Sequence, residues 1–302
     1  MSQSFLRPDK CLKLTTPSFK RRALALLLPL VLGWSTSAAH AQELTDLAKI
    51  RASGVLKVAV YKDNPPFSDG AVTDMQGLDV AIAQALARQL QLKLTLLPFD
   101  AGENMGDDLR NMVWKGHYLG YGPADVMMNV PVDKYLMQQN RQVLIFSPYM
   151  RQTQVLLHDA NVIPKVGSAE DLKGFKLAAE RGTGTASVLM AHHGGMLMSQ
   201  VALFSTGMDA ARAVIDGKAS AAFVMRSQAE SVLSKTLSQS PRWMLSPLAL
   251  PGIPESGWPL GMAIKSDYKE LAQALQKAMQ ELRSSGELLA IFKSHGMTLT
   301  TP

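Results

Sequence analysis

A glycine-threonine run offers the clearest binding chemistry in the chain. Residues 182–185 read Gly-Thr-Gly-Thr, and the pattern after them predicts a helix. A helix that begins at such a run presents free backbone N–H groups and the positive end of its dipole, which suit a carboxylate or a phosphate. Arg181 and Arg226 would add positive charge beside it. The run is equally compatible with a plain strand-to-helix turn in which glycine allows a tight bend.

Catalytic motifs are absent from the sequence. It contains no Gly-x-Ser-x-Gly, His-Glu-x-x-His or Walker motif. The pair His192 and His193 stands among glycines at a predicted helix end, where histidine more often bonds backbone carbonyls than a metal. The 17 methionines are scattered, which is typical of core packing rather than of copper binding. We therefore expect no metal site, no cofactor and no enzyme.

The elements that must position the binding residues alternate between strands and helices. This alternation predicts parallel strands with helices on both faces of a sheet. Ligands of such sheets bind at the carboxyl ends of the strands. The loops expected at those ends span residues 61–68, 99–104, 128–133, 180–185 and 225–228.

Some elements can be predicted in more detail. Residues 78–90 carry an apolar stripe at helical spacing, and residues 93–99 predict a buried strand. Ser168 and Asp171 stand at the spacing of a capping box and predict a short helix with Ser168 as its N-cap. Ser284, Ser285 and Gly286 should end a long amphipathic helix before a last helical turn.

Two crossovers divide the chain. The first follows the residues Phe-Ser-Pro-Tyr at 146–149, and four prolines between residues 247 and 259 mark the return, because proline can neither continue a helix nor donate to a central ladder. We predict an α/β fold of two lobes joined by two hinge strands, each lobe a mostly parallel sheet flanked by helices. Lobe one comprises residues 42–150 and 251–302, and lobe two residues 151–250.

The N-terminal segment has the features of a secretory signal. Lys20, Arg21 and Arg22 precede an apolar run of about a dozen residues, too short for the roughly 20 that span a bilayer. Ala39 and Ala41 then offer small residues for cleavage. We therefore assign residues 1–41 to a signal peptide and expect a periplasmic protein without a membrane anchor. Cys11, the only cysteine, would be removed with it, so no disulfide is expected.

The mature charge excludes one class of partner. Six of the 31 basic residues and one of the 25 acidic residues lie in residues 1–41, which leaves 25 against 24 in the remaining 261 residues. Binding to nucleic acid needs a clustered basic excess. We therefore expect no nucleic-acid partner, and a monomer large enough for two domains of ordinary size.

The order of several short motifs resembles the family 3 periplasmic solute-binding proteins, the soluble receptors of ABC importers. The matching residues are Asp-Asn-Pro-Pro-Phe-Ser at 63–68, Gly-Leu-Asp at 77–79, the acid-led strand from Asp125 and Phe-Ser-Pro-Tyr at 146–149, and the likeness covers nearly all of the mature chain. It implies the two-lobed type II periplasmic-binding-protein fold, a small-molecule ligand in the cleft and an importer permease as partner.

The same resemblance indicates which ligand is excluded. Amino-acid receptors of this family place an arginine after the strand that starts here at Asp125, and an acid where this chain has Met225. The arginine is missing, so we expect a neutral or anionic ligand that is not an α-amino acid. The residues predicted to bind it are Asn64, Phe67, Asn129, Asp133, Arg181, Gly182, Thr183, Thr185 and Arg226.

Further motifs resemble the branch associated with quinoprotein (PQQ-dependent) alcohol dehydrogenases. They lie at residues 63–68, 130–133, 146–153 and 294–297. This branch implies, as the alternative function, an accessory or maturation partner of a periplasmic quinoprotein dehydrogenase. The segment 114–123 concentrates aromatic side chains that suit a protein surface. The predicted partner-binding residues are Trp114, His117, Tyr118 and Tyr121, although Trp114 could equally cap the core beneath its helix.

A second alternative is an enzyme on the same fold. Relatives in this family include the cyclohexadienyl dehydratases, which use a cleft acid and a positioned water. The carboxylates of Asp74, Glu103 and Asp133 would be the candidates here.

The signal assignment predicts that the secreted protein begins at Gln42. Cleavage should follow Ala41, because Ala39 and Ala41 fit the cleavage rule directly after the apolar run. The intact mass of protein recovered from the periplasm measures this. A mass that includes Met1, or an acylated Cys11, would contradict the assignment.

Overall fold

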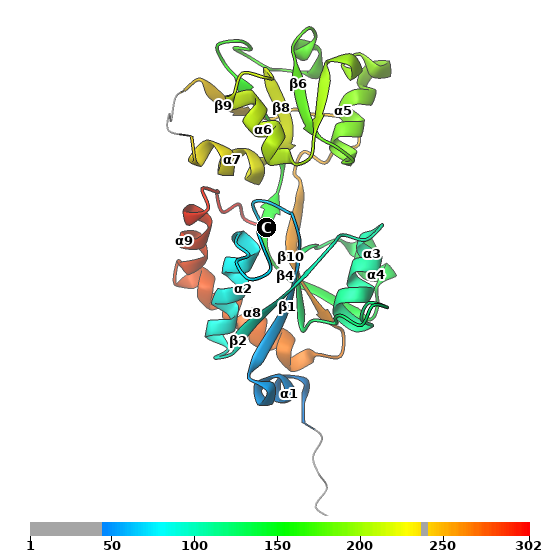
Figure 1. Cartoon of the computed structure of the whole chain (residues 1–302), viewed down its shortest axis with the longest axis vertical. Coiled ribbons are helices and arrows are strands. Elements are labelled where there is room, and N and C mark those ends of the chain that lie inside the picture. The colour runs from blue at the N-terminus through cyan, green and yellow to red at the C-terminus, as the bar shows by residue number, and fades with distance from the viewer. Residues whose placement is uncertain (1–43, 237–240) are drawn as a thin grey trace, which may run out of the picture. The chain divides into compact units, whose positions relative to one another are not determined.

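The computed structural model describes residues 44–236 and 241–302, so the predicted signal peptide and Cys11 lie outside the described residues. The described chain forms two α/β lobes, each built on a five-stranded mixed sheet with flanking helices (Figure 1). This confirms the predicted two-lobed fold. The predicted lobe boundaries themselves stay a prediction.

The sheet of lobe one has the strand order β2-β1-β3-β10-β4. Strands β2, β1 and β3 run parallel, whereas β10 pairs antiparallel with both β3 and β4. Its strands are β1 (Val55–Tyr61), β2 (Lys93–Phe99), β3 (Val126–Pro131), β4 (Val143–Gln152) and β10 (Trp258–Lys265).

The sheet of lobe two has the strand order β7-β6-β8-β5-β9. Strands β7, β6 and β8 run parallel, and β5 pairs antiparallel with β8 and β9. Its strands are β5 (Gln154–Asp159), β6 (Leu177–Glu180), β7 (Val201–Phe204), β8 (Ala221–Met225) and β9 (Trp243–Ser246).

Helices cover both faces of each sheet. Lobe one carries α1 (Asp46–Ser53), α2 (Leu78–Gln89), α3 (Met105–Leu109), the π-helical turn η1 (Arg110–Trp114), α4 (Lys134–Gln139), α8 (Lys269–Ser284) and α9 (Glu287–Ser294). Lobe two carries the 3₁₀ turns η2 (Ala169–Leu172) and η3 (Met198–Gln200) with α5 (Gly184–Gly195), α6 (Gly207–Ile215) and α7 (Arg226–Ser234). In the described chain no helix is long and apolar enough to cross a membrane.

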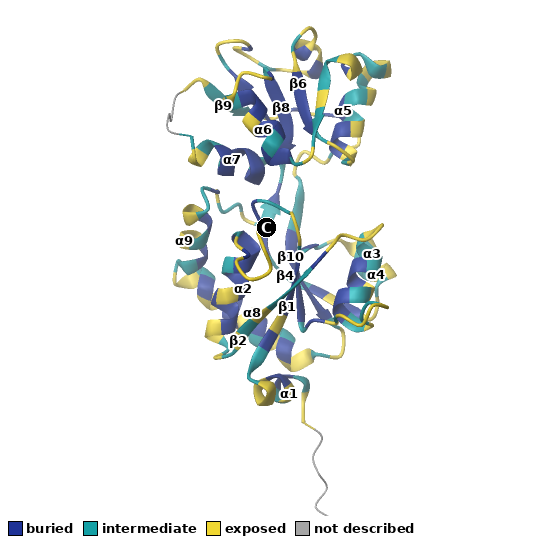
Figure 2. Ribbon diagram, viewed as in Figure 1, coloured by how far each residue is buried: buried dark blue, intermediate teal, exposed yellow. Residues whose placement is uncertain are grey.

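Alternation along the strands creates a core on each side of each sheet. In β1, Val58 and Val60 pack with α2, α8 and α9, whereas Ala59 between them joins the cluster under η1. In β8, Phe223 and Val224 likewise divide between the two clusters of lobe two. Successive side chains of a strand point to opposite faces, so a central strand that is covered on both faces, such as β8, is buried along most of its length (Figure 2).

Strand β2 departs from the sequence-based expectation. Residues 93–99 form the predicted strand, but Lys93 and Thr95 are exposed, and only Phe99 is fully buried. The reason is position, because β2 pairs with β1 alone and forms an edge of its sheet. The predicted burial was wrong, whereas the strand itself is confirmed.

Local signals at helix ends are confirmed. Ser168 and Asp171 form both hydrogen bonds of the predicted capping box at η2. The long helix α8 ends at Ser284, and α9 begins at Glu287 after Gly286 in the left-handed region. These helix ends depend on side chains within a few residues of each other, so they can be predicted from the sequence.

A close backbone contact holds the two hinge strands together. Trp258, at the start of β10, pairs with Gln152, at the end of β4. Gly257 precedes that pair at φ +63°, and a Cβ atom there would lie within 1.8 Å of the Gln152 carbonyl oxygen. Only glycine fits, because it has no Cβ and adopts positive φ without strain.

We predict that Gly257→Ala destabilises the protein strongly. Gly252→Ala is the matched control, because Gly252 also has positive φ, at +83°, but a Cβ there would meet no described atom within 4 Å. The control should lose about 1 kcal/mol from backbone strain, and Gly257→Ala at least about 2 kcal/mol more from the clash. Urea unfolding of both variants measures the difference. Equal losses would show that the hinge contact tolerates a side chain.

Candidate functional site

The parallel strands of each sheet end at one edge, and the loops that follow form the candidate site. In lobe one these strands end at Tyr61, Phe99 and Pro131, and in lobe two β6 and β8 end at Glu180 and Met225. Ligands of open α/β sheets bind outside such carboxyl ends. The predicted loops therefore occupy the edge at which a ligand is expected.

A carboxylate that the sequence analysis did not assign stands at the edge of lobe two. Glu180 Oε2 accepts a hydrogen bond of 3.1 Å from Gln228 Nε2, and Gln228 Oε1 accepts one of 3.1 Å from the backbone N–H of Met225. The buried side chain of Gln228 passes close to Gly207, where a Cβ would collide with it. A carboxylate thus lies close to Met225, at the end of the neighbouring strand β6. The order of the strands, which the sequence does not state, brings the two positions together.

The predicted glycine-threonine run begins α5, and its side chains are partly committed to the fold. Thr183 is the N-cap, accepting from the N–H of Ala186 at 3.1 Å and donating to the Glu180 carbonyl at 2.9 Å. Gly182 adopts the left-handed conformation that the bend requires. Thr185 is buried and bonds to the Gln154 amide. Each of these contacts belongs to a plain strand-to-helix turn.

An unpaired acceptor remains at this turn. The Oε1 atom of Gln154 is buried and has no hydrogen-bond partner among the described residues. A buried acceptor without a partner costs about 1–3 kcal/mol. A ligand or water that donates to this oxygen would remove that cost, so Gln154 belongs in the candidate site although it was not predicted.

The two predicted arginines differ in their surroundings. Arg226 Nη1 lies 3.3 Å from Glu230 Oε1, and the backbone N–H of Arg226 bonds to the Thr153 carbonyl beside the hinge. Arg181 is exposed, and no ion pair engages its guanidinium in the described residues. Arg181 is therefore the predicted cation that is free to meet an anion.

Most of the predicted ligand-binding residues in lobe one make contacts within the fold. Phe67 is buried in the core, where it packs with α2 rather than facing the cleft. Asp133 caps α4 by accepting from the N–H of Leu136 at 2.8 Å. The backbone of Asn64 pairs with Ser68 in a short bridge. Only Asn64 and Asp133 keep side chains outside the core at this edge.

Asn129 belongs to a buried polar network. Its Nδ2 donates to Asp79 Oδ2 at 2.8 Å, and its backbone N–H donates to the Tyr149 hydroxyl at 3.1 Å. That hydroxyl donates in turn to Asp79 Oδ1 at 2.7 Å. Asn129 stands at φ +63°, a conformation that asparagine adopts more readily than most residues. The network thus fixes the end of β3, where the site begins.

Burial dominates the ionisation of Asp79. Removal of the carboxyl from water raises its pKa to about 6, although the bonds from Asn129 and Tyr149 oppose the shift. A second bonded pair joins the end of β1 to α3, where the Tyr61 hydroxyl donates to Asp108 Oδ2 at 2.7 Å. Burial raises the pKa of Asp108 as well. Neither carboxylate was predicted as a site residue.

A cavity of about 840 Å³ opens beside the loops that follow the strand ends. Its walls come from the loop after β1 (residues 63–77), the start of α6, and parts of α7 and α9. The charged groups of the lining are Asp63, Asp69, Asp74, Asp209, Arg212, Lys235 and His295. None of the nine predicted ligand residues lines it, although Asp63 and Pro65 adjoin Asn64.

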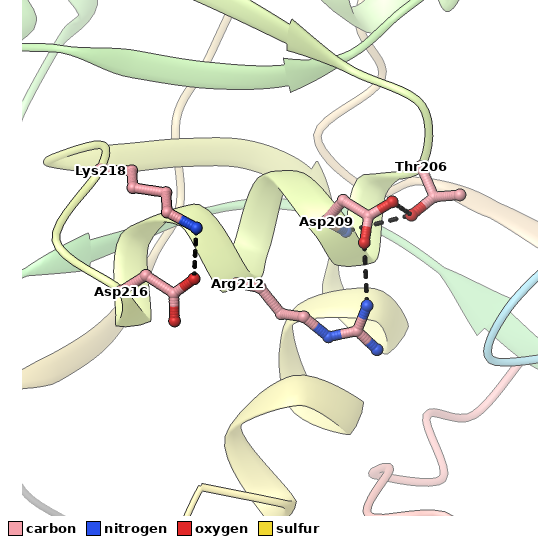
Figure 3. A network of polar contacts seen from close by, with 5 residues as sticks. All are labelled: Thr206, Asp209, Arg212, Asp216 and Lys218. Carbon is pink, nitrogen blue, oxygen red and sulfur yellow. Dashed lines mark hydrogen bonds and ion pairs between the residues drawn. The ribbon is translucent and has the colours of Figure 1, made fainter.

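One acid of the lining is neutralised locally. Asp209 Oδ1 accepts from Arg212 Nη1 at 2.9 Å, and its Oδ2 accepts from the Thr206 hydroxyl at 2.8 Å (Figure 3). At the C-cap of the same helix Asp216 pairs with Lys218 (Figure 3), and neither of these residues lines the cavity. Asp63, Asp69 and Asp74 form no ion pair among the described residues, although the charge of Lys62, which is paired with Asp100, also acts on Asp63. The lining therefore carries more negative than positive charge.

The aromatic segment after η1 divides between core and surface. Trp114 packs against the core of lobe one, as the alternative prediction for it states. The ring of His117 stacks on Tyr121 at 4.2 Å and lies against Tyr118 at 4.3 Å. Tyr118 is 87% exposed, and Leu119 and Tyr121 are also exposed. Three of the four predicted partner-binding residues thus form one surface cluster.

Comparison with known proteins supports the fold. No protein-family model and no curated protein sequence matches this chain. Among solved structures, an ancestral cationic amino-acid solute-binding protein, elsewhere described as a precursor of cyclohexadienyl dehydratase, is 21% identical with a TM-score of 0.64, covering 83% of this chain and 99% of its own.

Two further structures are similar to the chain. A polar amino-acid ABC uptake transporter substrate-binding protein from Streptococcus thermophilus is 18% identical with a TM-score of 0.63, covering 87% of this chain and 94% of its own. An amino-acid ABC transporter substrate-binding protein from Streptococcus pneumoniae, bound to L-arginine, is 19% identical with a TM-score of 0.58, covering 85% and 100%. The chain therefore has the two-lobed type II periplasmic-binding-protein fold.

The raised pKa of Asp79 predicts a pH-dependent stability. Because the folded pKa, about 6, lies above the ordinary value of 3.8, this group contributes stability at low pH that is lost as the pH rises through 6. Between about pH 4 and pH 7 the wild type should lose roughly 3 kcal/mol relative to Asp79→Asn, which keeps the shape without the charge.

Urea unfolding of the wild type and the variant across this range tests the shift. Asp267→Asn removes an exposed carboxylate and is the control, which should follow the wild type. A constant difference between Asp79→Asn and the wild type at all pH values would show that Asp79 is ionised throughout.

Proposed function

We propose that the protein is a periplasmic solute-binding protein, a receptor that binds a small molecule and serves an ABC importer. The observation that carries the proposal is the cavity of about 840 Å³, whose walls include the loop after β1 in lobe one and the turn after β7 with the start of α6 in lobe two. Its volume falls within the roughly 300–1,000 Å³ typical of small-molecule sites. The described similarities to ABC transporter substrate-binding proteins support the same function.

The charge of the cavity favours a ligand with a positive group. Asp63, Asp69 and Asp74 line the cavity without an ion pair in the described residues, while Asp209 is paired with Arg212. Carboxylates attract ammonium or guanidinium groups by Coulomb interaction and hydrogen bonding. The carboxylate of Glu180 adds an acceptor at the edge of lobe two. Since solved neighbours carry L-arginine, a cationic amino acid or related amine is our first candidate.

The neutral or anionic ligand that the sequence predicts is the second candidate. The exposed guanidinium of Arg181, next to the N-terminus of α5, favours it. The two candidates differ in the charge of the ligand, so one binding experiment separates them.

A different function remains for the aromatic surface cluster. We infer that His117, Tyr118 and Tyr121 suit contact with another protein, since exposed aromatic side chains are enriched at interfaces. The resemblance in sequence names a periplasmic quinoprotein dehydrogenase as that partner. This accessory function does not require the two lobes to close on a solute. It is also compatible with a protein that binds a solute.

The dehydratase alternative receives less support. Of its three candidate carboxylates only Asp74 lines the cavity, whereas Asp133 caps α4 and Glu103 lies outside the lining. A binding function accounts for the acidic lining without a catalytic pair. We therefore propose a receptor rather than an enzyme.

Calorimetric titration of the purified protein tests the first candidate. We expect L-arginine, L-lysine or a diamine to bind, and small dicarboxylates and phosphate to bind much more weakly. Asp69→Asn combined with Asp74→Asn should weaken the cationic ligand by about tenfold or more, because two charge contacts are lost.

Asp216→Asn is the matched control, because it removes a carboxylate on α6 that does not line the cavity. It should leave affinity unchanged. Tight binding of a dicarboxylate with no response to amines would instead establish the anionic ligand. Absence of binding to either class would contradict the receptor function.

A further inference from the structure

The histidine pair at the end of α5 has a different environment from the one its sequence suggests. The helix kinks there, with His192 at ψ 131° and His193 in the left-handed region at φ 45° and ψ 50°. The kink places the two rings side by side, stacked at 4.2 Å with 13° between their planes. Their ring nitrogens contact a carboxylate rather than the backbone carbonyls that the sequence analysis expected.

That carboxylate is Glu170, on the short turn η2. His192 Nε2 lies 3.4 Å and His193 Nδ1 lies 3.0 Å from the same oxygen, Glu170 Oε1. The turn is held by its capping box, in which Asp171 accepts from the N–H groups of Gly167 and Ser168 at 2.7 and 3.0 Å. Two independently fixed elements thus bring three potential metal ligands together.

We propose that Glu170, His192 and His193 form a binding site for a divalent transition metal ion, Zn²⁺ or Cu²⁺. The three donor atoms lie within 4.8 Å of one another. In a tetrahedral zinc site with bonds of about 2.0–2.1 Å the donors stand roughly 3.3–3.4 Å apart. The two distances to Glu170 Oε1 are already close to this separation.

Metal binding requires one further change, the rotation of a histidine ring, and the side chain of His193 is free to rotate. Nearly parallel rings do not direct both nitrogens at one ion, so one ring must rotate to bind. The side chain of His193 is 64% exposed, whereas that of His192 is 9% exposed and held in place. Rotation of His193 alone would complete the site, with water as the fourth ligand.

The donor set selects the class of metal. Two imidazoles and one carboxylate suit zinc and copper, and copper(II) binds such sets more tightly than zinc. Calcium and magnesium require several oxygen donors, of which this cluster offers the one carboxylate. We therefore expect Mg²⁺ and Ca²⁺ to leave the site unfilled.

The proposed metal site is separate from the candidate ligand site. Helix α5 begins at Gly184, at the strand ends, and the histidines lie near its other end. Turn η2 precedes β6, so Glu170 comes before the start of that strand and not after its carboxyl end. A bound ion would link η2 to α5, and the inference does not depend on the proposed receptor function.

Titration of the purified, untagged protein with Zn²⁺ in competition with a chromophoric chelator tests the site. We expect one equivalent to bind with micromolar or tighter affinity, and Cu²⁺ to bind more tightly. At roughly a hundredfold excess over the dissociation constant, Zn²⁺ should raise the melting temperature by about 5 °C.

The variants are chosen to keep the fold. Glu170→Gln keeps the shape of the side chain, and His193→Asn supplies a residue that tolerates the left-handed backbone. Each should weaken Zn²⁺ binding by at least about tenfold. His117→Ala removes an imidazole from lobe one and should leave binding unchanged.

Two results would overturn the proposal. One is that the wild type takes up no stoichiometric Zn²⁺ or Cu²⁺, which would identify the cluster as an ion pair of histidine and glutamate only. The other is that both variants, with melting temperatures in the absence of metal like that of the wild type, bind the metal as tightly as the wild type.

Discussion

The buried carboxylate of Asp79 is the constraint around which lobe one is arranged. It lies at the start of α2 and is bonded by Asn129 from the end of β3 and Tyr149 from β4. A buried carboxylate is tolerated only when its oxygens are satisfied, so the three elements must keep one mutual position. Asn129 adopts a left-handed backbone conformation at its position in the network. Strand β4 continues from Tyr149 into the hinge. The geometry of the binding edge and the start of the crossover are therefore set by one network.

The hinge depends on a second, purely steric constraint. The pairing of Trp258 with Gln152 brings β10 against β4, and Gly257 makes the approach possible. Strand β10 then enters the sheet of lobe one between β3 and β4 as its antiparallel member. The return of the chain thus completes the sheet whose edge carries the site. Folding of lobe one requires residues from both ends of the described chain.

The sequence predicted features whose causes are local and missed those that depend on strand order. The capping box at Ser168, the stop at Gly286 and the apolar alternation follow from neighbouring residues and were confirmed. Burial of β2 was mispredicted because an apolar run does not reveal an edge position. Glu180 was overlooked because its proximity to Met225 arises only when β6 pairs with β8.

The same reasoning explains why three of the predicted binding residues also make contacts within the fold. Phe67 and Asp133 follow the strands β1 and β3, as predicted, whereas Asn129 lies inside β3, near its end. Their side chains fill the core, cap α4 and complete the Asp79 network, respectively. A polar residue near a strand end has these local uses available, and only tertiary packing decides between them and a ligand. His192 and His193 were expected to bond backbone carbonyls at the helix end, but tertiary packing places their ring nitrogens against Glu170.

The C-terminal segment adds a third connection between the lobes. The N–H of Thr298 donates to Glu230 Oε2 on α7 at 2.8 Å, while Thr300 exchanges hydrogen bonds with the backbone of Arg151 on β4. Glu230 is also the partner of Arg226, so one carboxylate joins the candidate site to the end of the chain. The bond to Thr298 therefore ties α7 to the segment that is bonded to β4. The same carboxylate of Glu230 balances the charge of Arg226, so the surroundings of that guanidinium depend on where the C-terminal segment lies.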